Sequence, residues 1–103
     1  MSTYAVTWRD QAGAVHAGRL ELGSKGLRLE AGTHRGGRKS VLRMLYRDVL
    51  RAEMAPSRTR VRDRPTIALT GSNGSVYIAP AGPGFAREVL GLVQLGGLDS
   101  AQG

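Results

Sequence analysis

Residues 18–32, GRLELGSKGLRLEAG, have the pattern of an antiparallel β-hairpin. Leu20 and Leu22 alternate with charged residues before the Gly-Ser-Lys-Gly turn, and Leu27 and Leu29 alternate with charged residues after it. A period of two places alternate side chains on opposite faces of a strand, and glycine accepts the positive φ that tight turns require. This stretch therefore predicts two strands, each with one apolar face and one charged face.

The same alternation occurs on both sides of this hairpin. Tyr4, Val6 and Trp8 alternate with small, polar or charged residues and predict a first strand. Residues 66–80, TIALTGSNGSVYIAP, predict a second strand pair around a Gly-Ser-Asn-Gly turn. Three strands early in the chain and two late in it leave sheet edges that need partners.

Residues 40–55, SVLRMLYRDVLRAEMA, allow two interpretations. Their composition favours a helix, and four apolar residues recur with helical spacing, at Leu42, Leu45, Val49 and Ala52. Alternatively, 41–46 is a strand, 47–48 a corner and 49–55 another strand. We favour the two strands because the neighbouring sheet edges need partners.

The pattern changes to that of a helix after the Pro- and Gly-rich segment 80–84. Its apolar stripe consists of Phe85, Val89, Leu92 and Val93. We expect this stripe to cover an open end of the sheet, so that Phe85→Asp would bury an unpaired charge and be strongly destabilising. Gly96–Gly97 predicts the end of the helix. Residues 1–98 are expected to form a single domain, and 99–103 a disordered tail.

Seven short strands followed by one amphipathic helix resemble the pleckstrin-homology-like (PH-like) barrel, particularly small bacterial PH-type and GRAM-like domains. Within LYRDVLRAEMA (45–55), Tyr46, Asp48 and Val49 are similar to the family's aromatic–x–Asp–aliphatic corner before strand five. The resemblance implies a mainly β fold, a partly open barrel of seven antiparallel strands in two orthogonal sheets capped by one C-terminal α-helix. It also implies a scaffold whose ligands differ from member to member.

Charge and composition restrict the classes of partner and site. The chain carries 15 Lys plus Arg against 8 Asp plus Glu, a formal net charge of +7, and it has no Cys. A disulfide scaffold, thiolate chemistry and a Cys-based zinc site are therefore excluded. The sequence lacks both a secretory signal pattern and an apolar run of roughly 18 residues, so we expect a cytoplasmic protein without a transmembrane segment. The positive charge favours nucleic acid, anionic lipid or an acidic protein surface.

Two basic clusters are candidate anion-binding sites. The first lies in the glycine-rich segment GTHRGGRKS (32–40), which departs from the phosphate-binding pattern G-x-x-x-x-G-K-[ST] by one inserted Arg. The second lies in PSRTRVRDRP (56–65), where an extended backbone would point alternate arginines to one side and towards several phosphates. The candidate residues are Arg35, Arg38, Lys39, Arg58, Arg60, Arg62 and Arg64. In the PH family, phosphoinositide binding uses an Arg/Lys-x-Arg pattern in strand two, and here Glu21 replaces the second cation.

The sequence offers little support for catalysis. His16 and His34 lie in separate elements, and no carboxylate stands next to either in sequence to orient it. Glu21 and Glu30 are expected to form cross-strand ion pairs with Arg19 and Arg28, which alternate to the same face. We therefore expect a protein that is not an enzyme and has no cofactor and no metal site.

These patterns predict a non-catalytic PH-like binding or scaffold module. Its partner would be another protein chain or a second copy of itself, docked at strand edges along the barrel seam or in the groove beside the C-terminal helix. The alternative is an electrostatic binder of nucleic acid or anionic lipid that uses the arginine-rich loops.

Overall fold

The computed structural model describes residues 2–31, 40–82 and 84–102, with side chains of the last helix described as far as Gly96. Within these ranges, seven antiparallel strands form one sheet in the order β4-β3-β2-β1-β7-β6-β5. The strands are β1 (Ser2–Arg9), β2 (Val15–Leu22), β3 (Gly26–Ala31), β4 (Val41–Leu45), β5 (Arg51–Met54), β6 (Ile67–Gly71) and β7 (Gly74–Pro80). Three short 3-10 helices, η1 (Tyr46–Asp48), η2 (Ser57–Thr59) and η3 (Val61–Asp63), and helix α1 (Phe85–Gln102) complete the described fold.

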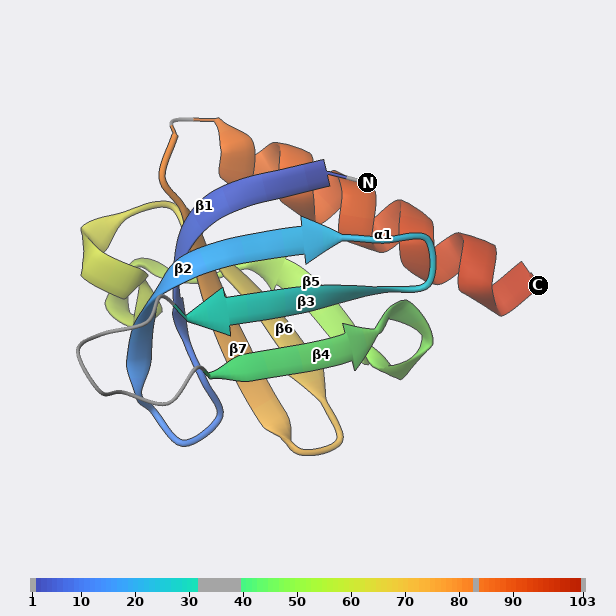
Figure 1. Ribbon diagram of the computed structural model, residues 1–103, viewed down its shortest axis with the longest axis horizontal. Coiled ribbons are helices and arrows are strands. Elements are labelled where there is room, and N and C mark those ends of the chain that lie inside the picture. The colour runs from blue at the N-terminus through green and yellow to red at the C-terminus, as the bar shows by residue number, and fades with distance from the viewer. Residues whose placement is uncertain (1, 32–39, 83, 103) are drawn as a thin grey trace.

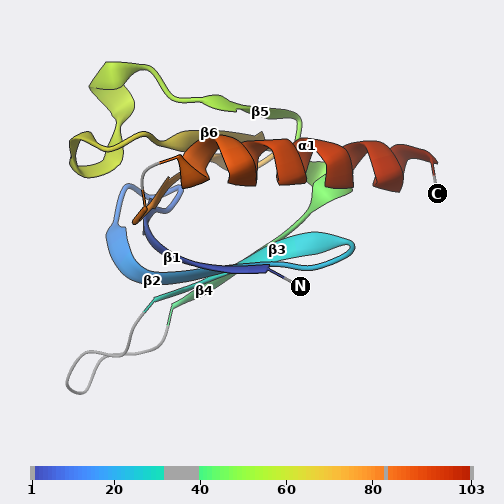
Figure 2. The same ribbon diagram turned by 90° about the horizontal axis from the view of Figure 1, so that it is seen from above.

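The sheet curls into a half-barrel that α1 caps (Figure 1). β1 pairs with both β2 and β7, and this pairing joins the two halves of the sheet. Viewed from above, β1–β4 form one wall and β5–β6 the opposite wall, with α1 running across the space between them (Figure 2). The expected mainly β fold of seven antiparallel strands, a partly open barrel capped by one C-terminal helix, is confirmed, and its strands are hydrogen-bonded into one continuous sheet. The two-strand interpretation of 40–55 is also confirmed, because β4, η1 and β5 occupy this segment.

The concave face of the sheet carries the hydrophobic core. Trp8, Leu20, Leu29, Ile67 and Ile78 are essentially fully buried there. Their positions follow from the period of two seen in the sequence, and each buried aliphatic side chain contributes about 1.5–3 kcal/mol to the free energy of folding. Core formation thus accounts for the curl, since only a curved sheet encloses these side chains.

Gly18 lets β2 and β3 approach closely in the middle of this wall. A Cβ atom added at Gly18 would overlap the carbonyl oxygen of Glu30. The Trp8 indole N–H donates a hydrogen bond to that same oxygen, at 3.2 Å. A buried indole donor therefore finds its partner where only glycine fits on the neighbouring strand.

Helix α1 closes one end of the half-barrel, but its buried stripe differs from the expected one. Val89 and Val93 are buried and Ala86 joins them, whereas Phe85 is 45% exposed and Leu92 is 38% exposed. Phe85 lies at the margin of the core, where its ring meets the Tyr4 ring edge-on at 5.8 Å between centroids. The expectation that Phe85→Asp would bury an unpaired charge is therefore wrong.

The expected end of the helix at Gly96–Gly97 is also wrong, since α1 continues to Gln102. Gly96 instead has a packing role, because a Cβ atom there would overlap the ring of Tyr46. Within the described residues, no helix is both long and apolar enough to cross a membrane.

We predict that Val89→Asp destabilises the protein far more than Phe85→Asp. An unpaired carboxylate at the buried Val89 position costs at least about 3 kcal/mol. Phe85→Asp should cost about 1–2 kcal/mol of unfolding free energy, because Phe85 is partly exposed and a carboxylate is favourable at a helix N-terminus. Urea unfolding followed by the fluorescence of Trp8 measures both variants. Equal losses of unfolding free energy would contradict this description of the cap.

Candidate functional site

The structure describes one of the two candidate anion-binding clusters. Arg35, Arg38 and Lys39 lie outside the described residues. In the second cluster all four arginines are exposed: Arg58, Arg60, Arg62 and Arg64. Their backbone is not continuously extended. Arg60 and Arg64 are extended, but Arg58 lies in η2 and Arg62 in η3, where Arg62 and Asp63 have φ values of 52° and 57°. The continuously extended backbone that the expected one-sided row requires is therefore not found in 57–64, while anion binding by these residues stays a prediction.

The shape of this loop follows from the burial of Val61 in its centre. Val61 is fully buried, and its N–H donates to Thr66 Oγ1 at 2.9 Å. The Thr66 hydroxyl in turn donates to the Arg64 carbonyl oxygen at 2.8 Å. Since these contacts hold the chain inward at one point, the flanking arginines project from turns rather than from a strand.

The convex face of β2 and β3 carries a network of two arginines and two glutamates. Arg19 Nε lies 2.8 Å from a Glu30 carboxylate oxygen, and an Arg28 terminal nitrogen lies 2.7 Å from the other. Glu21 lies 3.6 Å from both arginines. The hydrogen bond to Glu30 raises the pKa of Arg19, and the charges of Glu30 and Glu21 raise it further. The expected cross-strand ion pairs are confirmed, and each glutamate has a cationic partner.

His16 has a carboxylate partner that is not adjacent to it in sequence. Its Nε2 lies 2.8 Å from Asp10 Oδ2, because the turn between β1 and β2 brings Asp10 back over the hairpin. Asp10 Oδ1 accepts hydrogen bonds from the backbone N–H groups of Ala12 and Ala14. The His16 ring also packs on Trp8, with centroids 4.4 Å apart. These contacts clamp the hairpin, and among the described residues no group of three metal-binding side chains is found.

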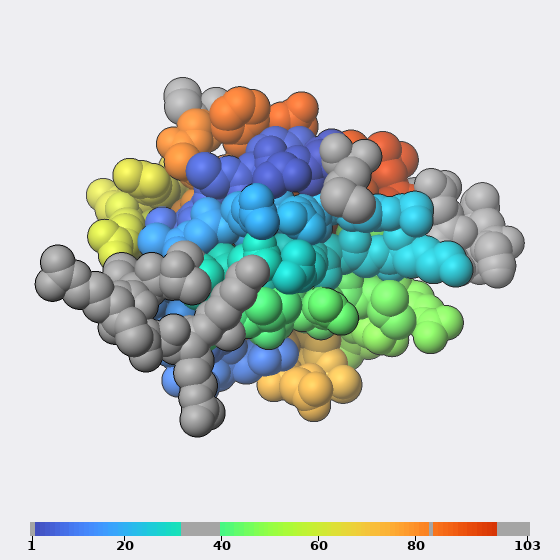
Figure 3. All heavy atoms as spheres, viewed as in Figure 1, coloured from blue at the N-terminus to red at the C-terminus, as the bar shows by residue number. Residues whose placement is uncertain are grey.

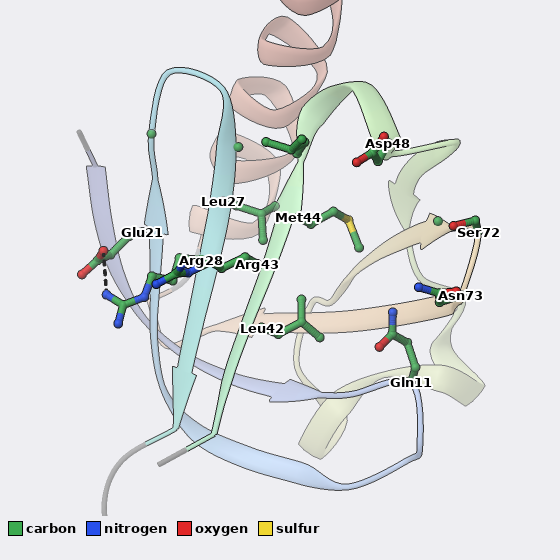
Figure 4. A pocket seen from close by; sticks show the side chains of 14 residues that line it. Gln11, Glu21, Leu27, Arg28, Leu42, Arg43, Met44, Asp48, Ser72 and Asn73 are labelled. Atoms are coloured by element: carbon green, nitrogen blue, oxygen red, sulfur yellow. Dashed lines mark ion pairs between the residues drawn. The ribbon is translucent and has the colours of Figure 1, made fainter.

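An open groove of about 710 Å³ lies beside β4 and is called the β4 groove below. Apolar side chains form one part of its lining, and polar side chains from two hairpin turns form another: Leu27, Leu42, Met44, Gln11, Ser72 and Asn73. Leu42 and Met44 also pack against the hydrophobic core. Figure 4 shows Met44 pointing towards Ser72 and Asn73 across the groove. In the space-filling view, β4 lies near the tip of the β6–β7 hairpin (Figure 3).

β4 is an edge strand, and its register determines which backbone groups face outward. Tyr46 N–H donates to the Lys25 carbonyl oxygen at 3.0 Å, which fixes the alternation of antiparallel bonds between β3 and β4. By this alternation the N–H and C=O groups of Leu42 and Met44 face β3. Those of three residues face outward: Val41, Arg43 and Leu45. Within the described ranges, no strand pairs with that side of β4.

The opposite edge of the sheet, β5, is partly covered by α1. At β5, the Gln94 side chain donates to the Ala52 carbonyl oxygen at 3.3 Å, and α1 packs along this strand. A smaller cavity of about 450 Å³ lies beside the start of β1 and the start of α1, and Tyr4 and Phe85 are among the residues that line it. The β4 groove therefore combines the larger cavity with an uncovered strand edge.

Comparison with known proteins finds no matching family model for this chain and no similar curated protein. The function of the β4 groove is therefore argued below from the residues that line it. Only the strand order shows that β4 is an edge.

We predict that the stabilisation of the protein by the Asp10–His16 clamp is lost in strongly acidic solution. The hydrogen bond from His16 lowers the pKa of Asp10 below the ordinary value of 3.8. A carboxyl with a depressed folded-state pKa stabilises the fold above its unfolded pKa, and this contribution is lost as pH falls through the folded value. Wild type should therefore lose its Tm advantage over Asp10→Asn as the pH falls below the ordinary carboxyl pKa of 3.8. The exposed Asp63→Asn is the control, and parallel Tm curves for wild type and Asp10→Asn would contradict the clamp.

Proposed function

We propose that this protein is a non-catalytic PH-like module that binds an extended segment of another protein along the edge of β4. The proposal rests above all on the uncovered β4 edge beside the β4 groove. An additional strand would hydrogen-bond to the outward backbone groups of Val41, Arg43 and Leu45. The half-barrel, the corner at Tyr46 and the capping helix support the PH-like assignment.

The edge and the groove would act together on one ligand. In an added strand, successive side chains alternate between the two faces of the sheet. One set would enter the groove beside Leu42 and Met44, while backbone hydrogen bonds hold the strand in register. With only three outward-facing residues on β4, we expect affinity of about micromolar strength, as in small transient interfaces.

The alternative function is binding of nucleic acid or anionic lipid through the exposed arginines of 57–64. It is favoured by the net charge of +7 and by the exposure of all four arginines. Such binding would fall steeply with salt, since it releases counterions from phosphates. Strand addition would survive reversal of these charges, so the two functions make opposite predictions for the same variants.

The variant Leu45→Pro tests strand addition directly. Leu45 has a φ of −76°, which proline adopts, and its N–H faces away from β3. The substitution therefore removes an outward donor while keeping the ladder to β3. Peptides selected from a random display library against wild type should bind Leu45→Pro at least about tenfold more weakly, by fluorescence anisotropy. Leu45→Ala keeps the N–H and should bind within about threefold of wild type.

Two further measurements complete this test. Selected peptides should shift the backbone amide NMR signals of Val41, Arg43 and Leu45, and variants with the loop arginines changed to Glu should bind them as wild type does. The proposal is contradicted if the library yields no binder, or if Leu45→Pro binds as tightly as wild type. Signal changes confined to 57–64 would support the alternative function.

A further inference from the structure

We infer that the segment bound at β4 carries a carboxylate directly opposite Arg43, with apolar side chains immediately before and after it. This inference rests on the proposed function, because it assigns the chemistry of the segment that occupies the β4 groove. The observations that carry it are the surroundings of Arg43 on the convex face and of Leu42 and Met44 on the concave face.

Arg43 is a cation whose cross-strand neighbour is also a cation. It lies directly opposite Arg28 in the register of β3 and β4. Arg28 already contacts Glu30 at 2.7 Å and Glu21 at 3.6 Å. Arg43 is exposed and has no ion pair with any residue in the described ranges. Since like charges directly opposite each other destabilise a strand pair, a carboxylate on the open side of Arg43 would offset this repulsion.

The alternation of β4 determines which positions of the bound segment meet which surface. Figure 4 shows the side chains of Arg28 and Arg43 on one side of β3 and β4, and those of Leu42 and Met44 on the other. A residue opposite Arg43 in an added strand projects to the side of Arg43. The residues before and after it project into the groove beside Leu42 and Met44, where apolar side chains are buried best.

The residues two positions away from the carboxylate meet a second apolar surface. They lie beside Val41 and Leu45, which are 42% and 39% exposed on the same face as Arg43. Covering these side chains favours apolar or β-branched residues in the bound segment. The expected sequence is therefore an acidic residue within a short run of apolar and β-branched residues.

A second copy of the chain fits this edge poorly. Two copies related by a twofold axis would pair their β4 strands in antiparallel fashion. Pairing centred on Arg43 places the two Arg43 side chains opposite each other. A register centred on Leu42 or Met44 leaves them as diagonal neighbours on one face, still within reach. The excess of positive charge on this edge therefore favours an acidic partner over self-association.

The acidic residues near the groove form no ion pair with Arg43. Glu21 is engaged with Arg19 and Arg28 on the neighbouring strands. Asp48 lies across the groove from Arg43, on the side of Ser72 and Asn73 (Figure 4). Glu30 is likewise engaged with Arg19 and Arg28. Since none of the acidic residues in the described ranges pairs with Arg43, we place this carboxylate on the bound segment.

Three fluorescein-labelled peptides of matched sequence test the inference. They are Ser-Val-Leu-Glu-Leu-Thr-Ser and its versions with Lys or Gln in place of Glu, all with blocked ends. Wild type should bind the Glu peptide roughly fivefold to twentyfold more tightly than the Lys peptide, since attraction and repulsion each change affinity by up to about fivefold. The Gln peptide should lie between them, and higher salt should narrow the differences.

The variant Arg43→Glu should reverse this order of affinities. The matched control Arg58→Glu makes the same change in net charge away from the groove and should keep the wild-type order. If the three peptides bind equally while shifting the Val41 and Leu45 amide signals, the inference is wrong and strand addition stands. If no peptide shifts those signals, both proposals are contradicted. A wild-type protein that sediments as a dimer with these amides covered would also overturn the inference.

Discussion

The burial of Tyr46 fixes the position of η1, where the chain passes from β4 at one edge of the sheet to β5 at the other. Its hydroxyl donates to the Gly23 carbonyl oxygen at 2.8 Å, and its N–H donates to the Lys25 carbonyl oxygen at 3.0 Å. Its ring lies against Gly96 of α1. Burial raises the pKa of the phenol, which keeps the hydroxyl a neutral donor. These contacts tie η1 at once to the β2–β3 turn and to the helical cap.

This corner explains why the sheet remains open. β4 and β5 are consecutive in the chain but lie at opposite edges of the sheet, because η1 carries the backbone between the two walls. One edge, β5, packs against α1, and the Gln94 side chain donates a hydrogen bond to the Ala52 carbonyl oxygen on this strand. The other edge, β4, borders the groove that reaches the β6–β7 turn. The same local packing thus positions the cap and leaves the candidate binding edge uncovered.

Much of the fold was predictable from alternation alone. The hairpin expected at 18–32 forms within its described residues, 18–31, and the strand pair at 66–80 forms as expected. The need for edge partners correctly decided 40–55. Helical spacing correctly predicted that Val89 and Val93 are buried. Spacing does not show how deeply each residue of a stripe is buried, so it wrongly predicted burial for Phe85. Glycine is common at helix ends, so the sequence predicted an end at Gly96. Its packing role becomes visible only from the Tyr46 ring that lies against it.

The features of the candidate site depend on register and on turns, which the sequence does not display. Asp10 meets His16 because a hairpin folds one onto the other. The segment 57–64 is not one extended strand, and Val61 in its centre is buried in the core. Alternation places Arg43 on an outer face, but its position opposite Arg28 follows from the pairing of β3 with β4.

Amide hydrogen exchange of the free protein, followed by NMR, tests most directly whether the β4 edge is uncovered. The structure predicts slow exchange for Leu42 and Met44, whose N–H groups face β3, and fast exchange for Arg43 and Leu45, whose N–H groups face outward. This alternation within one short strand is the signature of a free edge. Uniformly slow exchange across all four amides would show that the edge is already covered and would contradict the account.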